Sequence, residues 1–277
     1  MRITGSTRLA AVIGHPVGHS LSPALYNAAF AETEVDQVFV AFDVVAQNLT
    51  GFVDSVRTLD ITGFSVTMPH KEAILSLVDE VSASAAALGA ANCVVNQAGV
   101  LRASNTDGDG FVKAVAHDFG FDVVDSCMVV LGAGGAARSL VEALARHGAR
   151  EIVVVNRSPE AAARAVALGG GVARVGLASD IATADLVVNA TPLGMHGDKS
   201  RQMPCDPARL RAGQFVVDLI YAPHRTRWLD AAESAGAEVA NGLSMLVFQA
   251  ATQFFIWTGL EAPITTMLAV VESEEAS

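Results

Sequence analysis

The chain has 277 residues, more than one hydrophobic core usually serves, so we expect two domains with a cleft between them. Its formal charge of −11 excludes the basic surface that nucleic-acid binding requires, and we expect a small-molecule partner. Hydrophobic residues make up 51% of the chain, but its apolar stretches are short or interrupted by glutamine, which excludes a membrane-spanning helix.

The N-terminus, the cysteines and the histidines narrow the class of protein further. No apolar h-region of a signal peptide precedes the first strand-like run, so we expect a cytoplasmic protein, either a monomer or a homodimer. The three cysteines and seven histidines are scattered without metal-ligand spacing. We therefore expect neither a disulfide nor a metal site.

Apolar runs of strand length alternate with segments of helical periodicity along most of the chain. The runs occupy residues 9–13, 37–42, 62–66, 92–95, 126–131, 151–155, 185–190 and 215–220. This alternation predicts an α/β protein with mostly parallel sheets. A new βαβ unit begins at residue 126, which places a domain boundary near residue 106, and two helices are expected after Val239.

The first polar cluster is GHPVGHSLSPAL, after the first apolar run. Ser22 stands before Pro23, which predicts an N-cap followed by proline at the first helical position. Ser20 has no such structural role in the sequence and can offer its hydroxyl to a ligand. Each serine is therefore either a ligand contact or a part of the local turn.

The second polar cluster is FSVTMPHKEAIL. Here a strand ends at Thr67, turns at Pro69 and is expected to enter a helix with Lys71 in its first turn. The helix dipole disfavours a cation at that end, so another interaction should retain Lys71, and a general acid–base role would provide one. The alternative is a solvated lysine on an opening turn.

Two further clusters lie in ALGAANCVVN and LRASNTDGDGF. Asn92 opens a strand and brings one amide donor and one amide acceptor. Asn105, Thr106 and Asp107 precede Gly108, a turn or N-cap signal for the helix expected over 110–119. A carboxylate near Lys71 could also orient the amine and bind a substrate hydroxyl.

A glycine-rich turn follows the strand CMVVL and precedes an amphipathic helix. Its sequence fits the GxGxxA pattern, in which Gly132 allows a tight turn, Gly134 lets the backbone approach a pyrophosphate, and Ala137 permits close contact between helix and strand. The strand before the motif and the helix after it favour dinucleotide binding over a flexible loop.

The next strand ends in Asn156, Arg157 and Ser158. An NAD-binding protein usually carries an acidic residue there for the ribose 2′-hydroxyl, and this chain has none. Arg157 instead offers a planar, charged donor set that suits a 2′-phosphate, with Asn156 and Ser158 as further donors. The sequence therefore predicts NADP rather than NAD, unless Arg157 is simply a solvated surface arginine.

These clusters, with NATPLGM and NGLSMLVFQA, occur in an order along nearly the whole chain that resembles the shikimate dehydrogenase family. The resemblance implies an N-terminal α/β substrate domain of residues 1–105 and 240–277, with a helix over 247–258 returning to it. It also implies a Rossmann-type, doubly wound NADP-binding domain of residues 106–239. The implied reaction is the NADP-dependent interconversion of shikimate and 3-dehydroshikimate in aromatic amino-acid biosynthesis.

The resemblance also implies roles for individual residues, with Lys71 and Asp107 as the catalytic pair. The expected substrate-binding residues are Ser20, Ser22, Ser65, Thr67, Asn92, Tyr221 and Gln249. The expected cofactor-binding residues are Gly132, Gly134, Gly135, Ala136, Asn156, Arg157, Ser158, Thr191, Met195 and Gly242.

Three positions depart from the family pattern. Ser65 and Tyr26 stand where the family commonly has Asn and His, and Ala161 stands where a second basic residue is common, with Arg164 almost one turn further on. A shorter side chain at position 65 would re-aim hydrogen bonds around the substrate ring. Open alternatives are therefore a paralogue for quinate or an aminoshikimate-type analogue, an NAD-dependent enzyme, and a sensor without turnover.

Overall fold

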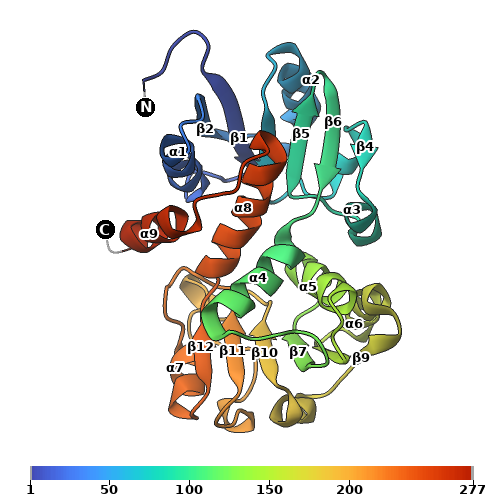
Figure 1. Ribbon diagram of the computed structural model, residues 1–277. Coiled ribbons are helices and arrows are strands. Elements are labelled where there is room, and N and C mark those ends of the chain that lie inside the picture. Colours follow the sequence, from blue (N-terminus) through green and yellow to red (C-terminus); the bar gives the residue numbers. More distant parts are fainter. Residues whose placement is uncertain (1, 276–277) are drawn as a thin grey trace. The chain divides into compact units, whose positions relative to one another are not determined.

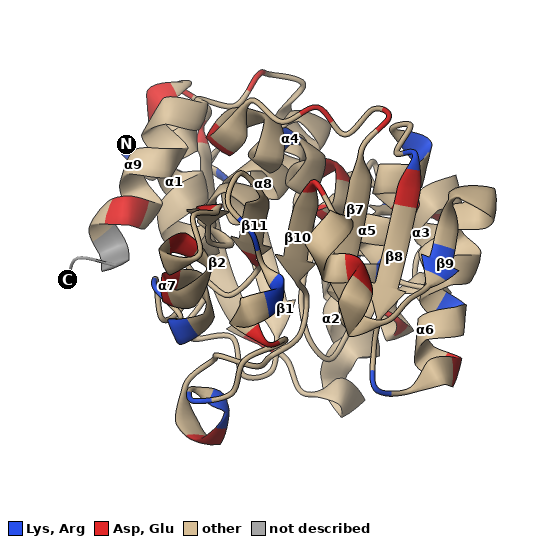
Figure 2. Ribbon diagram, turned by 90° about the horizontal axis from the view of Figure 1, so that it is seen from below, with Lys and Arg blue, Asp and Glu red and all other residues tan. Residues whose placement is uncertain are grey.

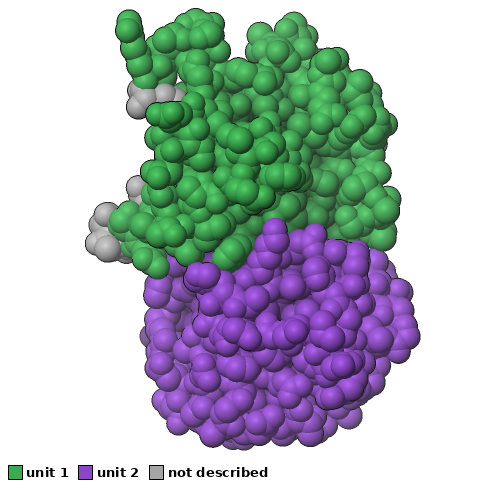
Figure 3. All heavy atoms as spheres, in the orientation of Figure 1, with its two compact units in different colours: residues 1–106, 247–277 green, residues 107–246 purple. Residues whose placement is uncertain are grey.

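The computed structural model describes residues 2–275, and Figure 1 shows its elements in chain order. Contacts between residues divide the chain into two compact units, coloured in Figure 3. Unit 1 comprises residues 1–106 and 247–277, and unit 2 comprises residues 107–246. The chain therefore leaves unit 1 once and returns to it within its penultimate helix.

Unit 1 is built on a six-stranded sheet with the order β2-β1-β3-β5-β6-β4. Its strands are β1 (Arg8–Gly14), β2 (Gln37–Asp43), β3 (Gly63–Val66), β4 (Glu80–Val81), β5 (Cys93–Gln97) and β6 (Val100–Ser104). Its helices are α1 (Ser22–Glu32), α2 (Leu49–Thr58), α3 (Ala83–Leu88), most of α8 (Leu243–Thr258) and α9 (Ile264–Glu275). The core contains mainly aliphatic side chains from β1, β3, β5, β6 and α2.

This sheet is mixed, whereas the sequence predicted mostly parallel strands. β1 pairs in parallel with β2 and β3, but β5 runs antiparallel to both β3 and β6. The reason is the connection between β5 and β6, which consists of Ala98 and Gly99, both with positive φ (53° and 89°). A two-residue turn of this kind joins antiparallel strands, while parallel strands need a long crossover.

Helix α8 packs its apolar side onto the sheet of unit 1. Trp257 donates from Nε1 to the carbonyl oxygen of Val94 at 3.0 Å, and its ring lies 5.1 Å from that of Tyr26. Gly63 allows this approach, because a Cβ there would lie 2.5 Å from Trp257 Nε1. The helix that the resemblance implied over 247–258 therefore exists and begins earlier, at Leu243.

Unit 2 is built on a fully parallel six-stranded sheet with the order β12-β11-β10-β7-β8-β9. Its strands are β7 (Cys127–Leu131), β8 (Glu151–Val155), β9 (Ala173–Val175), β10 (Leu186–Asn189), β11 (Phe215–Asp218) and β12 (Glu238–Ala240). Its helices are α4 (Asp107–Phe119), α5 (Gly135–Arg146), α6 (Pro159–Val166) and α7 (Arg227–Ser234). Acidic and basic residues are mixed along α6 and α7 (Figure 2).

The strand order of unit 2 is that of a doubly wound Rossmann fold. The first strand, β7, lies between β8 and β10, so the connections leave it in both directions and the order reverses there. Ligands of such sheets bind outside the carboxyl ends of the strands at this reversal. The predicted fold class, α/β with a Rossmann-type unit, is confirmed, and the turn after β7 is the place to look for a dinucleotide site.

Candidate active site

Lys71 lies in an irregular turn and not in the first turn of a helix, so that expectation is wrong. The nearest regular element is a short 3-10 helix, Ala73–Ser76. The carbonyl oxygen of Lys71 accepts a hydrogen bond from the backbone N–H of Ala91 at 2.8 Å. This long-range hydrogen bond replaces the one that the oxygen would accept within a helix. Lys71 is therefore not in the first turn of a helix, where the helix dipole would disfavour its charge.

A buried histidine anchors the turn that carries Lys71. The His70 side chain is 1% exposed, and its Nε2 lies 2.6 Å from the carbonyl oxygen of Val44, just after β2. Since a carbonyl only accepts, Nε2 carries the hydrogen in this bond. The backbone N–H of His70 also donates to Thr67 O at 3.0 Å. The turn is thus tied both to the end of β2 and to the residue after β3.

Four polar side chains form a buried network in unit 1, which we call the amide network: Asn92, Thr106, Gln249 and Gln253. Asn92 lies just before β5, where its Oδ1 accepts from Thr106 N at 2.8 Å. Its Nδ2 donates to Thr106 Oγ1 at 3.0 Å and to Gln249 Oε1 at 3.2 Å. The structure therefore brings together two predicted substrate residues, Asn92 and Gln249, through hydrogen bonds that sequence alone could not specify.

Gln253 is the member of the amide network that sequence reasoning missed. It is 1% exposed and lies one turn after Gln249 on α8, and its Nε2 donates to Gln249 Oε1 at 2.7 Å. A signal was present in the sequence, because two glutamines four residues apart in an otherwise apolar helix share one face. A polar side chain on the buried face of a helix needs partners there.

Ser65 and Tyr26, two of the three departures from the family pattern, both contact Gln253. Ser65 Oγ donates to Gln253 Oε1 at 2.5 Å, and the Tyr26 hydroxyl donates to the same oxygen at 2.9 Å. Tyr26 is fully buried, and burial raises the pKa of its hydroxyl well above the ordinary value, so it stays a neutral donor. In this structure the Ser65 hydroxyl hydrogen is directed to Gln253.

The serines before α1 have a different local arrangement from the one expected. Ser22 is not the N-cap, because it is already the first residue of the helix and Leu21 precedes it as the cap residue. Ser20 takes over part of the capping role, since its Oγ accepts from the backbone N–H of Ser22 at 3.3 Å. Within residues 2–275, neither serine forms a side-chain hydrogen bond with the amide network.

The glycine-rich turn after β7 has the geometry that a dinucleotide requires. Gly132 has a φ of +114°, and a Cβ there would lie 3.0 Å from the carbonyl oxygen of Ala190. Gly134 is the N-cap residue of α5, and a Cβ on Gly134 or Gly135 would meet no atom within 4 Å. Ala137 is fully buried against the sheet. The turn thus leaves open space in front of a helix N-terminus, where an anion is favoured.

The segment after β8 contains an exposed arginine, Arg157, and an acidic residue, Glu160, that sequence reasoning did not consider. Arg157 is exposed, and within residues 2–275 it makes no ion pair, so it is available for a phosphate. Ser158 caps α6 by accepting from Ala161 N at 3.2 Å, and its Oγ donates to Glu160 Oε2 at 2.9 Å. A phosphate at Ser158 would therefore compete with the Glu160 carboxylate.

Buried polar side chains hold the loop after β10, which contains Thr191 and Met195. Asn189 Oδ1 accepts from both the N–H and the hydroxyl of Thr191, at 2.9 and 2.7 Å. Asn189 Nδ2 in turn donates to Asp218 Oδ1 at 2.9 Å. Asp218 is fully buried, and this burial raises the pKa of its carboxyl although Thr226 and the Ile220 N–H donate to it. The ends of β10 and β11 thereby fix the loop.

Tyr221 and Gly242 lie after β11 and β12 in unit 2. Gly242 has to be glycine, because a Cβ there would lie 2.2 Å from the carbonyl oxygen of Leu219. Met195 is 45% exposed. These residues follow the carboxyl ends of the parallel strands, where the ligands of a doubly wound sheet bind.

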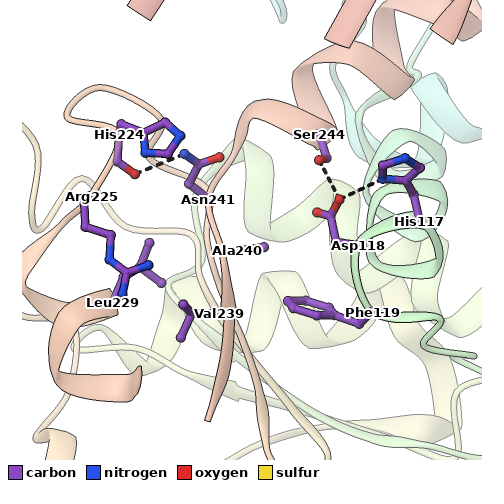
Figure 4. Close-up of a pocket in the computed structure, with 10 residues that line it drawn as sticks. All are labelled: His117, Asp118, Phe119, His224, Arg225, Leu229, Val239, Ala240, Asn241 and Ser244. Carbon is purple, nitrogen blue, oxygen red and sulfur yellow. Dashed lines mark hydrogen bonds and ion pairs between the residues drawn. The ribbon is translucent and has the colours of Figure 1, made fainter. Parts of the chain in front are cut away.

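A pocket of about 400 Å³ lies in unit 2 beside β12, and none of the predicted site residues is among those that line it (Figure 4). Its lining residues are His117, Asp118, Phe119, His224, Arg225, Leu229, Val239, Ala240, Asn241 and Ser244. Ser244 Oγ donates to Asp118 Oδ1 at 2.7 Å across it. Asn241 Nδ2 donates to the carbonyl oxygen of His224 at 3.0 Å, and Arg225 forms ion pairs with Asp230 and Glu233, which do not line the pocket. These polar side chains have partners within the protein, so the pocket does not identify a ligand.

Within residues 2–275, no three His, Cys, Asp or Glu side chains gather where a metal ion could be held. Among the helices described, none combines the length and the apolar character needed to cross a membrane.

Family models match three parts of the chain. The model described as shikimate dehydrogenase substrate binding domain matches residues 12–94. The model of shikimate / quinate 5-dehydrogenase matches residues 114–220, and that of the shikimate 5′-dehydrogenase C-terminal domain matches residues 242–272. Together the three matches fall on both units.

Individual relatives match along almost the full length. A protein of Moorella thermoacetica named shikimate dehydrogenase (NADP(+)) is 42% identical, over 96% of this chain and 93% of its own. A crystal structure of shikimate 5-dehydrogenase from Listeria monocytogenes with shikimate and NAD is 34% identical, with a TM-score of 0.92 over 98% of both chains. A Thermus thermophilus structure with NADP(H) and shikimate is also 34% identical, with a TM-score of 0.89 over 96% of this chain and 99% of its own.

Proposed function

The chain belongs to the shikimate dehydrogenase family, and on that premise we propose that it interconverts shikimate and 3-dehydroshikimate with NADP, in aromatic amino-acid biosynthesis. The observation that carries the proposal is the match at 42% identity along 96% of the chain to a relative of that name. The sequence-based hypothesis of an NADP-dependent oxidoreductase of this family is supported by the same match.

The chemistry assigns complementary tasks to the two ligands and the protein. NADP bound to unit 2 would supply the hydride acceptor for the ring carbon that carries the hydroxyl, and NADPH would supply the hydride for the reverse direction. The protein has to remove the hydroxyl proton and hold the ring. We assign proton transfer to Lys71 and Asp107, because an amine and a carboxylate can share that proton and orient the hydroxyl.

Unit 1 is proposed to hold most of the substrate contacts, and unit 2 is proposed to hold the dinucleotide. The proposed substrate domain comprises residues 1–105 and 240–277, and the proposed dinucleotide-binding domain comprises residues 106–239. The proposed substrate contacts are Ser20, Ser22, Thr67, Asn92, Tyr221 and Gln249. Ser65 is proposed to act on the substrate site through Gln253, since its hydroxyl hydrogen is directed there.

The glycine-rich turn supports the assignment of the dinucleotide to unit 2. The positive φ of Gly132, the open space at Gly134 and Gly135 and the N-terminus of α5 fit a pyrophosphate. The further cofactor contacts are proposed to be Ala136, Asn156, Arg157, Ser158, Thr191, Met195 and Gly242. Arg157 is the proposed partner of the 2′-phosphate, because it is exposed and has no carboxylate partner in residues 2–275.

Quinate is the second candidate substrate, because one matching family model covers both shikimate and quinate dehydrogenases and Ser65 departs from the usual residue. Quinate differs from shikimate in its ring substituents, so the network around Ser65 would decide between them. NAD is a weaker candidate cofactor, because no acidic residue ends β8.

The proposed partners are small molecules, in a cytoplasmic monomer or homodimer. A formal charge of −11 opposes binding to nucleic acid. The ligand itself is a cyclic polyhydroxy carboxylate, which a few donors such as Asn92 and Gln249 can orient.

Product analysis tests the proposed function. The purified protein is incubated with shikimate and NADP, and the products are separated and identified by mass spectrometry. We expect 3-dehydroshikimate and NADPH in equal amounts. The absence of both products, in protein that binds shikimate in calorimetry, would leave a sensor without turnover as the better account.

A further inference from the structure

The hydrogen bonds of the amide network determine which way each side-chain amide faces. Asn92 is fixed first, because the backbone N–H of Thr106 can only donate and lies 2.8 Å from Asn92 Oδ1. The other amide atom of Asn92, Nδ2, is therefore a donor, and it lies 3.2 Å from Gln249. Gln249 must present its oxygen there.

Gln253 leads to the same orientation of Gln249 from an independent starting point. The backbone carbonyl of Asn92 can only accept, and it lies 3.3 Å from Gln253 Nε2. Gln253 therefore faces Gln249 with a donor, at 2.7 Å, and Gln249 must again present its oxygen. On its other side, Gln253 Oε1 accepts from Ser65 and Tyr26.

Both hydrogen-bond positions of the Gln249 oxygen are thus occupied by donors within unit 1. This orientation puts the amide hydrogens of Gln249 on the side of the group away from these two donors, and an amide hydrogen suits an acceptor atom of a ligand. Gln253 itself cannot bind the ligand directly, because its oxygen takes two donors, its nitrogen faces three acceptors, and its side chain is 1% exposed.

We propose that Gln253 is a positioning residue of the substrate site, which directs the amide hydrogens of Gln249 to an acceptor oxygen of the hydroxy acid. The proposal rests on the proposed function, in which Gln249 contacts the substrate. Tyr26 and Ser65 belong to the same chain of hydrogen bonds. Both donate to the Gln253 oxygen and so oppose a 180° rotation of the Gln253 amide, which would exchange its oxygen and nitrogen. Two of the three departures from the family pattern, Ser65 and Tyr26, therefore contact the same residue.

The test compares steady-state kinetics of Gln253→Met with those of the wild type. Methionine keeps the length of the side chain and removes both polar atoms, so the Gln249 oxygen loses the nearer of its two amide donors and keeps only the Asn92 amide. We expect the KM for shikimate to rise about tenfold while kcat changes much less, because the lost interaction orients the substrate equally in ground and transition states. Gln214→Met is the matched control, because Gln214 is a fully buried glutamine of unit 2 whose Nε2 binds two backbone carbonyls.

A double-mutant cycle separates positioning from a merely structural role. If Gln253 acts through Gln249, the variant Gln249→Ala with Gln253→Met has the same KM as Gln249→Ala alone. Additive increases in KM would overturn the proposal, and so would an unchanged KM in Gln253→Met.

Tyr26→Phe keeps the proposal testable if Gln253→Met does not fold. It removes only the hydroxyl, and Tyr26 is too deeply buried to touch a substrate. We expect a smaller rise in KM that disappears in the Gln249→Ala background, and an unchanged KM would overturn the proposal. Failure of the proposed function is distinguishable, because the wild type would then not oxidise shikimate at all.

Discussion

Lys71 is the residue on which the proposed chemistry depends most. The turn that contains Lys71 is held by the buried His70 and by the hydrogen bond from the Ala91 N–H. The backbone of Lys71 therefore has a well-defined position. Lys71→Ala should lower kcat by about 10²- to 10⁴-fold, the usual contribution of general acid–base catalysis. The measurement is kcat and KM for shikimate, with Lys113→Ala as a control on the surface of α4. A change in KM alone would make Lys71 a binding residue.

Arg157 is the residue that should set the preference for NADP. Removing a charged hydrogen-bond donor to a phosphate usually costs about 1.5–3 kcal/mol, so Arg157→Ala should raise the KM for NADP about tenfold or more. The KM for NAD should stay as it is, because NAD lacks the 2′-phosphate. Arg164→Ala, in the last turn of α6, is the control. Equal losses for both cofactors would refute the role in phosphate binding.

At the residue scale, sequence reasoning named the candidate site residues that carry motifs and missed residues whose contacts depend on packing. Lys71, Asn92 and Gln249 follow from motifs and from the resemblance. Gln253 and Glu160 could not be predicted in this way. Their hydrogen bonds to Ser65 and Ser158 appear only in the three-dimensional structure. The irregular turn at Lys71 was likewise hidden, since it depends on the remote N–H of Ala91.

The element that most directly tests the cofactor site is the turn between β7 and α5. Gly132→Ala would place a Cβ 3.0 Å from the Ala190 carbonyl oxygen, on a backbone with φ of +114° that alanine rarely adopts. We expect a loss of about 1 to 3 kcal/mol in the free energy of unfolding and a higher KM for NADP.

Urea unfolding and cofactor kinetics measure this prediction. Gly171→Ala is the control in the same unit, because a Cβ there meets no atom within 4 Å and the residue is not among those with positive φ. Equal stability of Gly132→Ala and the wild type would show that the turn relaxes to accept a side chain.

At the scale of elements, the longer strands were predictable and the short edge strands were not. The apolar runs at 37–42 and 151–155 became β2 and β8 almost unchanged. β9 and β12 have only three residues each, and their sequences, Ala-Arg-Val and Glu-Val-Ala, carry too little periodicity to separate them from loops. Their pairing with β8 and β11 makes them strands.

The stability of the whole molecule should depend on pH through Asp218. Burial raises the pKa of this carboxyl above its ordinary value of 3.8. A raised pKa in the folded state favours folding at low pH, and this contribution is lost as the pH rises from 3.8 through the folded pKa. Asp218→Asn, which keeps the acceptor for Asn189 and Ile220, should lack this loss.

The measurement is the free energy of unfolding of both proteins in urea between about pH 4 and pH 8. The wild type should lose stability relative to Asp218→Asn as the pH rises, until the Asp218 carboxyl is fully ionised. Asp54→Asn, at an exposed position of α2, controls for the change in net charge. A difference between wild type and variant that is constant over the whole range would contradict the raised pKa.

For the whole molecule, the sequence predicted the α/β class and the Rossmann-type unit, and both are confirmed by the sheet order and by the solved relatives. The return of α8 to unit 1 could not be derived from periodicity, because any apolar face would satisfy that helix. It depends on contacts such as the one between Trp257 and Val94, for which Gly63 leaves the space.

The central claim is that this chain is a shikimate dehydrogenase that uses NADP, and the ratios of kcat/KM test it most directly. Initial rates are measured with shikimate and with quinate, each with NADP and with NAD. We expect the highest kcat/KM for shikimate with NADP, and a large loss in kcat/KM when quinate replaces shikimate or NAD replaces NADP. A higher kcat/KM for quinate or for NAD would contradict it.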